Sequence, residues 1–128
     1  GEALAMGDLR LKFQRAKHFI QAYAMRLECG GSSLTYSADT APCDEMVEFA
    51  RASSLFLCEA TLGSGEEAGE RGHSSAIEAG RMAARAGAKR LVLTHYRFAD
   101  SVDKIIREAQ GEYNGPVDAA ASGLKLSI

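Results

Sequence analysis

Alternation of apolar and polar positions predicts strands in the first third of the chain. Apolar residues alternate with polar ones over 9–13, and a similar pattern covers 22–28 until the chain reaches Gly30 and Gly31. A two-residue period places apolar side chains on one face of a strand, and paired glycines favour a turn. A short third strand, 33–37, is therefore expected directly after the glycines.

Helices and buried strands are expected to alternate in the rest of the chain. Pro42 opens a helical pattern, and the apolar runs 55–58 and 89–94 are typical of strands that are buried on both faces. Residues 101–110 form an amphipathic helical pattern. Two short strands are expected to follow it.

Start and stop signals predict one more helix. Ser75 and Glu78 have the S-x-x-E spacing of a capping box, and Gly87 is a typical helix end. The glycine- and glutamate-rich segment 63–72 in front of it predicts a loop. Strands followed by α/β alternation indicate an α/β (α+β) domain in which helices pack on a mixed sheet.

Composition limits the classes of protein to consider. The chain has 128 residues, 46% of them hydrophobic, so it can bury one core. Its 15 Lys and Arg against 17 Asp and Glu leave a net charge of −2, which disfavours nonspecific binding to nucleic acid. No apolar stretch approaches the roughly 18 residues of a membrane span, and no signal peptide is evident, so a cytoplasmic protein is expected. The three cysteines are too widely spaced for a zinc ribbon and are expected to be free thiols.

Residues able to bind metal or carry protons stand at the ends of the predicted elements. His18 lies between two strands, His73 precedes the capped helix, and His95 follows an apolar strand. Asp39 and Glu59 also come at strand ends. Because ligands of open α/β sheets bind beyond the carboxyl ends of the strands, Asp39, Glu59 and His95 are expected to converge there.

Three of these residues, His18, Asp39 and His95, are suitable ligands for zinc or a similar divalent ion. Their spacings of 21 and 56 residues are too long to form a local metal-binding signature. Simpler interpretations stay open, because Asp39 can stabilise the start of the following helix, and a histidine at the end of a strand or in a loop needs no ligand.

Short segments of the chain, in this order, resemble the second half of a metallo-β-lactamase-fold hydrolase of the ribonuclease Z-like branch. The most specific are YSADT at 36–40, CEAT at 58–61, GHSS at 72–75 and LTHY at 93–96, and the segments 17–20 and 23–28 resemble the stretch that precedes them. The likeness extends over nearly all 128 residues.

The resemblance implies a role for each candidate residue. His18 would bind the first of two metal ions, Asp39 would bridge both, and His95 would bind the second. The ions would be zinc, with manganese or iron as alternatives. His73 would donate a proton to the leaving group, and Glu59 would orient it.

The resemblance also implies that residues 1–128 form the C-terminal half of an αββα sandwich. The HxHxDH motif of the family, which supplies the remaining metal ligands in the N-terminal half, does not occur in this sequence. The isolated chain is therefore expected to be inactive, and it could lack bound metal.

The sequence departs from the family pattern in three places. Only twenty residues separate His18 from Asp39, where true ribonuclease Z has a longer insertion that contributes to its substrate channel. Ala38 and Cys58 replace a glycine and a histidine that are common there. Ala38 is expected to have ordinary backbone angles.

Three functions follow as hypotheses. The first is part of a metal-dependent hydrolase acting on a small phosphodiester or another ester. The second is a noncatalytic module that docks on the missing N-terminal half or on a second copy of the chain. The third, a tRNA 3′-end endonuclease, is disfavoured by the charge and by the absent insertion.

Overall fold

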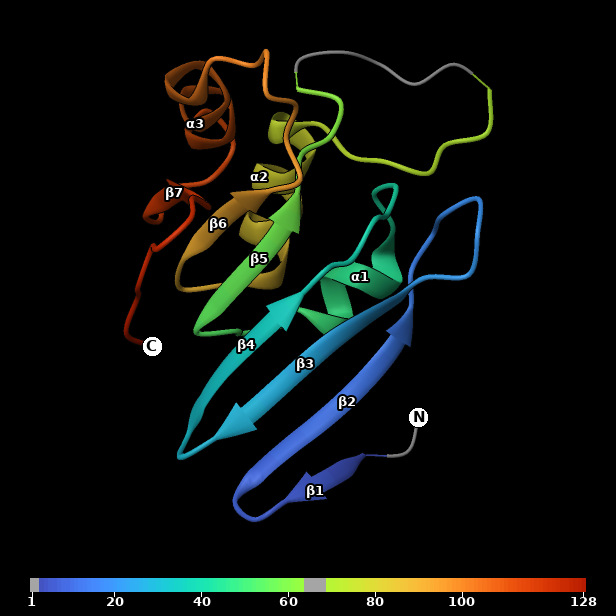
Figure 1. The fold of residues 1–128 in the computed structure, drawn as a ribbon, viewed down its shortest axis with the longest axis vertical. Coiled ribbons are helices and arrows are strands. Elements are labelled where there is room, and N and C mark those ends of the chain that lie inside the picture. Colours follow the sequence, from blue (N-terminus) through green and yellow to red (C-terminus); the bar gives the residue numbers. More distant parts are fainter. Residues whose placement is uncertain (1–2, 64–68) are drawn as a thin grey trace.

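The computed structural model describes residues 3–63 and 69–128 (Figure 1). In these ranges the chain forms one mixed sheet and three helices. In chain order the elements are β1 (Leu4–Met6), β2 (Leu9–Arg15), β3 (Tyr23–Cys29), β4 (Ser32–Tyr36), α1 (Asp44–Phe49), β5 (Leu55–Glu59), α2 (Ala76–Ala86), β6 (Leu91–Thr94), α3 (Val102–Gln110) and β7 (Val117–Ala119).

The order of strands in the sheet is the same as their order in the chain. Strands β1 to β4 pair antiparallel, and β4 to β7 pair parallel. Gly30 and Gly31, with φ of 56° and 83°, form the two-residue turn between β3 and β4. Positive φ at both central residues is the geometry that two-residue hairpins prefer, which explains the glycine pair.

Helix α2 has the predicted start and stop. Ser75 accepts a hydrogen bond from the backbone of Glu78, Glu78 accepts one from the backbone of Ser75, and Gly87 ends the helix at φ 63°. Its small residues allow α3 to approach closely, since a Cβ on Gly80 would lie 2.5 Å from the carbonyl oxygen of Ala109. The small residues of this helix thus serve helix–helix packing.

The helices pack on one face of the sheet, where α2 contacts β5, β6 and both other helices. The core between them contains the alternate residues of the central strands that point this way, Phe56, Cys58, Leu91 and Leu93, together with Met46, Ala79, Met82 and Ile105 from the helices. This packing makes the central parallel strands the most rigid support for whatever follows their carboxyl ends.

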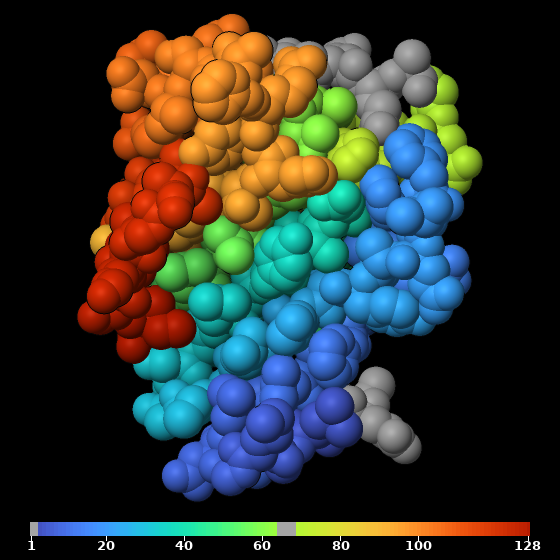
Figure 2. Space-filling view, viewed as in Figure 1, coloured from blue at the N-terminus to red at the C-terminus, as the bar shows by residue number. Residues whose placement is uncertain are grey.

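The opposite face of the sheet is only partly covered by the chain (Figure 2). The tail after β7 lies over one part of it and leaves a groove of about 270 Å³, lined by Leu34, Leu55, Leu57, Val92, Leu124, Leu126 and Ile128, together with Ala120 and Ala121 of the tail. Farther along, Leu9, Leu11, Met25 and Leu27 remain partly accessible and Phe13 is exposed. Both faces of the sheet are therefore built for burial.

The predicted α/β class and mixed sheet are confirmed, with three local differences. Strand β1 was not predicted, and α1 begins at Asp44 rather than at Pro42. Only β7 follows α3, because residues 120–128 run as an irregular tail across the sheet face, so the second short strand was wrong. The middle of the predicted loop, 64–68, lies outside the described residues. Within the described ranges, none of the helices has the length and apolar character to cross a membrane.

Candidate metal and proton-transfer site

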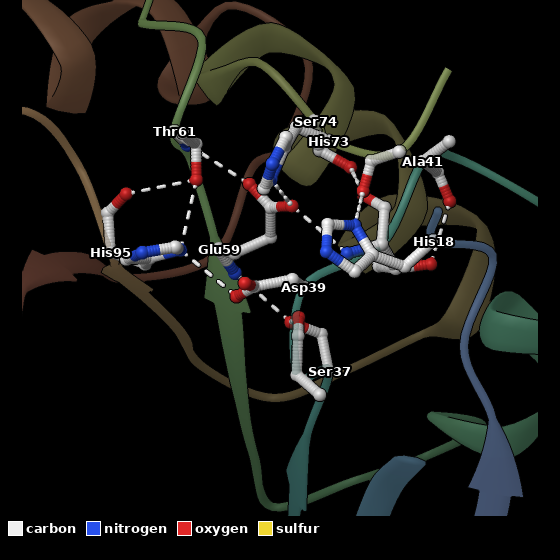
Figure 3. A network of polar contacts seen from close by, with 12 residues as sticks. His18, Ser37, Asp39, Ala41, Glu59, Thr61, His73, Ser74 and His95 are labelled. Carbon is white, nitrogen blue, oxygen red and sulfur yellow. Dashed lines mark hydrogen bonds and ion pairs between the residues drawn. The ribbon is translucent and has the colours of Figure 1, made fainter. Parts of the chain in front are cut away.

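The candidate residues gather beyond the carboxyl ends of three neighbouring parallel strands (Figure 3). Asp39 follows β4, Glu59 is the last residue of β5, and His95 comes directly after β6. The structure brings His73, from the segment before α2, and His18, from the loop between β2 and β3, to the same place. In Figure 3, Glu59 lies between the His95 side and the His18 side of the cluster.

Asp39 and His95 face each other directly. Asp39 Oδ1 lies 2.9 Å from His95 Nδ1, and the hydroxyl of Thr61 lies 3.0 Å from the same nitrogen. The Thr61 hydroxyl donates to the carbonyl of His95 at 3.1 Å, so it can accept from Nδ1. Thr61 thus restrains both the ring and the backbone of His95.

The backbone turns sharply just before Asp39 and at His95. Ala38 and His95 both have φ of 52°, in the left-handed region that side chains with a Cβ rarely adopt. Ordinary angles were expected at Ala38, and that expectation was wrong. The turn is supported by Ser37, whose hydroxyl donates to the Ala38 carbonyl at 2.7 Å. Strain of this kind, about 1–3 kcal/mol per residue, tends to persist where it directs functional side chains.

Glu59 is fully buried, and both of its carboxylate oxygens accept hydrogen bonds. Its Oε1 accepts from the backbone N–H of Thr40 at 2.9 Å, and its Oε2 accepts from that of Thr61 at 2.9 Å. Its own N–H donates to the Ser37 hydroxyl at 3.0 Å. Backbone donors of this kind compensate a buried carboxylate for lost water and fix it in place.

His73 is held by this carboxylate. Its Nδ1 lies 2.9 Å from Glu59 Oε1, so the tautomer in which Nδ1 carries the proton is favoured. Nε2 is then the ring atom that can bind a metal ion or exchange a proton.

His18 lies beside His73 rather than beside Asp39. The two ring centroids are 4.8 Å apart, at an interplanar angle of 69°. The Nδ1 of His18 donates to the carbonyl of Gly72 at 2.8 Å, which leaves Nε2 as its ligand atom. A Cβ at Gly72 would lie 2.6 Å from the Phe19 ring and 2.9 Å from His18 Nδ1, so a larger residue here would displace these rings.

Three of the cluster residues already lie within ligand distance of one another. Asp39, His73 and His95 each offer one ligand atom, and these atoms are all within 4.8 Å. Two ligands of one zinc ion, each about 2.1 Å from it, are up to about 4.2 Å apart, so small adjustments suffice. Nitrogen and carboxylate donors suit zinc, manganese and iron. This triad, found among the residues that the structure describes, contains His73, whereas the sequence predicted His18 as the third ligand. The ligand set and the role of each residue remain predictions.

Burial and nearby negative charge raise the pKa of two neighbouring side chains. Burial, with the carboxylates of Asp39 and Glu59, raises the pKa of Tyr36, so its phenol stays protonated near neutral pH. Burial likewise raises the pKa of the Cys58 thiol far above its usual range. Cys58 is therefore part of the core and not a metal-binding thiolate.

Sequence reasoning missed several residues that hold this site together. Thr40, Thr61 and Gly72 each bond to a candidate residue, yet no role was predicted for them. All three stand inside the short segments on which the resemblance rested, next to a candidate residue or two positions away. That proximity was the one available signal.

Known proteins share both the sequence and the fold. The family described as a β-lactamase superfamily domain matches residues 1–96. The chain is 40% identical to an uncharacterised protein of Mycobacterium leprae, over all of this chain and 45% of that protein. It is 40% identical to ribonuclease Z of Myxococcus xanthus, over 77% of this chain and 33% of that protein.

A solved structure agrees with this fold in detail. It is YhfI of Bacillus subtilis, described as a metallo-β-lactamase fold protein, which matches this chain with a TM-score of 0.90 and 31% sequence identity. The match covers 96% of this chain and 51% of the YhfI chain. The chain thus spans about half the length, or less, of the relatives it matches. It belongs to the β-lactamase superfamily and has the metallo-β-lactamase fold.

Proposed function

We propose that this chain contributes metal ligands and a proton donor to a metal-dependent hydrolase of phosphodiesters or other esters. One observation carries the proposal, namely that Asp39, His73 and His95 place ligand atoms within 4.8 Å of one another beside the Glu59–His73 pair. A curated relative, the probable metallo-hydrolase YhfI, supports it. The two-ion zinc site and the choice of ester are part of the proposal.

The side chains have separable tasks in this reaction. Asp39 and His95 would hold a divalent ion, and His18 would complete the ligand set on the other side of His73. A bound divalent ion lowers the pKa of water toward neutrality and polarises a phosphoryl or carbonyl oxygen. Glu59 would keep His73 in one tautomer, so that Nε2 can give a proton to the leaving oxygen.

Metal binding is the first test. The complete protein should bind zinc or manganese in a titration against a chromophoric chelator and should hydrolyse bis(p-nitrophenyl) phosphate. Asp39→Ala should abolish both, whereas Asp103→Ala, which removes an exposed carboxylate at the start of α3, should change neither. Unchanged metal content and turnover in Asp39→Ala would refute the proposal.

A second test separates the two tasks open to His73. If His73 donates a proton, His73→Gln should lower kcat by about 10²–10⁴-fold for an ester with a poor alkoxide leaving group and much less for p-nitrophenolate. Metal affinity should then change little. If the variant instead loses metal and slows both substrates equally, His73 is a ligand and the proposed proton transfer is wrong.

We also propose that the partly accessible sheet face is covered by the other half of the sandwich, which would bring the HxHxDH ligands. Leu9, Leu11, Met25 and Leu27 favour such a cover, because a partly accessible apolar patch of this kind marks a contact surface. The same observation supports the alternative of a noncatalytic module that docks on a partner half or a second copy. Metal-free, inactive complete protein that still associates would favour that alternative.

The tRNA 3′-end endonuclease is supported by the relatives named ribonuclease Z and opposed by the net charge of −2. Cleavage of a precursor tRNA, compared with that of a small phosphodiester at equal enzyme concentration, decides between them. A large preference for the tRNA would replace the small-ester proposal.

A further inference from the structure

Thr40 is hydrogen bonded to several segments of the site but is not a member of the triad. It follows Asp39 directly, is fully buried, and uses all three of its polar groups. Its N–H donates to Glu59 Oε1 at 2.9 Å, and its carbonyl accepts from the Ser74 hydroxyl at 2.6 Å. Its own hydroxyl accepts from the N–H of Lys17 at 3.1 Å and donates to the carbonyl of Ala41 at 2.8 Å.

These bonds join every segment that carries a candidate residue on this side of the cluster. Lys17 precedes His18, and Ser74 follows His73, so two of the bonds of Thr40 end one residue away from a histidine. A further bond, from the N–H of Ala41 to the carbonyl of Lys17 at 2.7 Å, closes the connection to the His18 loop. Thr40 thus bonds to three of these segments at once.

We propose that Thr40 is the positioning residue of this site, whose hydroxyl sets the place of His18 and whose carbonyl sets that of His73. The proposal rests on the proposed function for its consequence, because correct placement of the histidines matters most if they serve a metal ion. Groups that orient metal ligands typically affect metal affinity by 10–100-fold.

Thr35 provides a matched control. It is also fully buried, and its hydroxyl is also hydrogen bonded, to Ser53 at 2.7 Å and to Arg26 at 3.3 Å. It lies within β4, however, and these partners of its hydroxyl, Ser53 and Arg26, are not candidate residues or their neighbours. Loss of either hydroxyl removes a buried hydrogen bond, but only Thr40 should affect the histidines.

The experiment uses the complete protein and compares Thr40→Val, Thr40→Ser, Ser74→Ala and Thr35→Val. In metal-free protein, the nitrogen and proton NMR signals of the imidazoles report placement. We expect Thr40→Val to shift the His18 signals, Ser74→Ala to shift those of His73, and Thr35→Val to shift neither. Zinc affinity, from competition with a chromophoric chelator, should fall at least tenfold in Thr40→Val and recover to within about twofold of wild type in Thr40→Ser.

Each outcome decides the proposal. Wild-type imidazole signals in folded Thr40→Val, or an equal loss of zinc affinity in Thr35→Val, would overturn it, as would Thr40→Ser behaving like Thr40→Val. Wild-type protein that binds no zinc would contradict the proposed function alone, because the NMR comparison in metal-free protein still tests the placement of His18.

Discussion

Two residues at the candidate site have backbone angles that carry a cost. Ala38 and His95, both at φ 52°, turn the chain at the ends of β4 and β6. The left-handed region costs a residue with a Cβ about 1–2 kcal/mol. The rest of the fold must therefore offset this free-energy cost, which is incurred at the turns that bring Asp39 and His95 to face each other.

This cost can be measured at Ala38. Ala38→Gly should raise the free energy of unfolding by up to about 1 kcal/mol, because the relieved strain exceeds the entropy that glycine adds to the unfolded chain. Urea unfolding measures the change. Ala84→Gly, at an exposed position within α2, is the control and should lower stability by about 1 kcal/mol. A destabilised Ala38→Gly would show that the turn is not strained.

The cysteines should differ in reactivity in a way that follows burial. Cys29 is exposed, whereas Cys58 is fully buried and its thiol pKa is raised by burial. Iodoacetamide near pH 8 should modify Cys29 in the folded protein and reach Cys58 only after denaturant is added. Peptide mass spectrometry follows both sites. Equal rates at Cys29 and Cys58 in native buffer would mean that the core around β5 opens readily.

At the scale of elements, α2 positions His73 through its first turn. Glu78 bonds to the Ser75 N–H at 2.9 Å and to both terminal nitrogens of Arg71 at 2.6 and 2.7 Å. Burial alone would raise the pKa of Glu78, but the bonds from Arg71 and Ser75 outweigh it, so this pKa lies below its usual value of 4.5. The carboxylate thus ties the segment that carries His73 to the helix.

The lowered pKa predicts a pH dependence. The stabilisation from Glu78 is present above pH 4.5 and is lost as the pH falls through the lower folded-state pKa. Glu78→Gln should therefore cost about 0.5–1 kcal/mol at pH 7 and much less below pH 4. Glu48→Gln is the control, because both members of its pair with Arg51 are exposed and no measurable loss is expected. A Glu78→Gln deficit that is the same at both pH values would contradict this account.

The elements that sequence reasoning predicted well have local signals. The capping box at Ser75 and the glycine at Gly87 determine the two ends of α2, and the paired glycines determine the β3–β4 turn. Strand β1 has no such signal, since it spans three residues and is held only by its pairing with β2. The path of the tail, residues 120–128, likewise depends on contacts with a sheet face whose residues lie far away in the sequence.

The features of the site also divide into those that the sequence predicted and those that it did not. The placement of Asp39, Glu59 and His95 at strand ends followed from the rule for parallel sheets, and the structure brings them together. The hydrogen bonds that orient the rings join residues far apart in the chain, such as His18 with Gly72 across 54 positions. No local pattern specifies such a contact, so the proximity of His18 to His73 could not be derived from spacing.

The whole molecule should associate through its partly accessible sheet face. Apolar residues of β2 and β3 on that face, including Leu11 and Leu27, are only partly buried by this chain. The 128-residue chain alone should therefore self-associate as its concentration rises, as sedimentation velocity would show. Leu11→Glu should make it monomeric, whereas Gln14→Glu, which adds the same charge on the other face of β2, should not. A wild-type chain that stays monomeric at high concentration would contradict this.

The agreement between sheet order and chain order has a consequence for how the molecule assembles. Each strand adds beside the one formed just before it, so loop closures stay short and the hairpins of β1 to β4 can form early. Asp39, Glu59 and His95 lie at the ends of three successive strands, β4, β5 and β6. Their cluster is therefore complete only when β6 has paired with β5. A bound ion should thus slow amide exchange in β5 and β6 while hardly changing it in β1 and β2, because it would join the ends of the strands that complete the cluster.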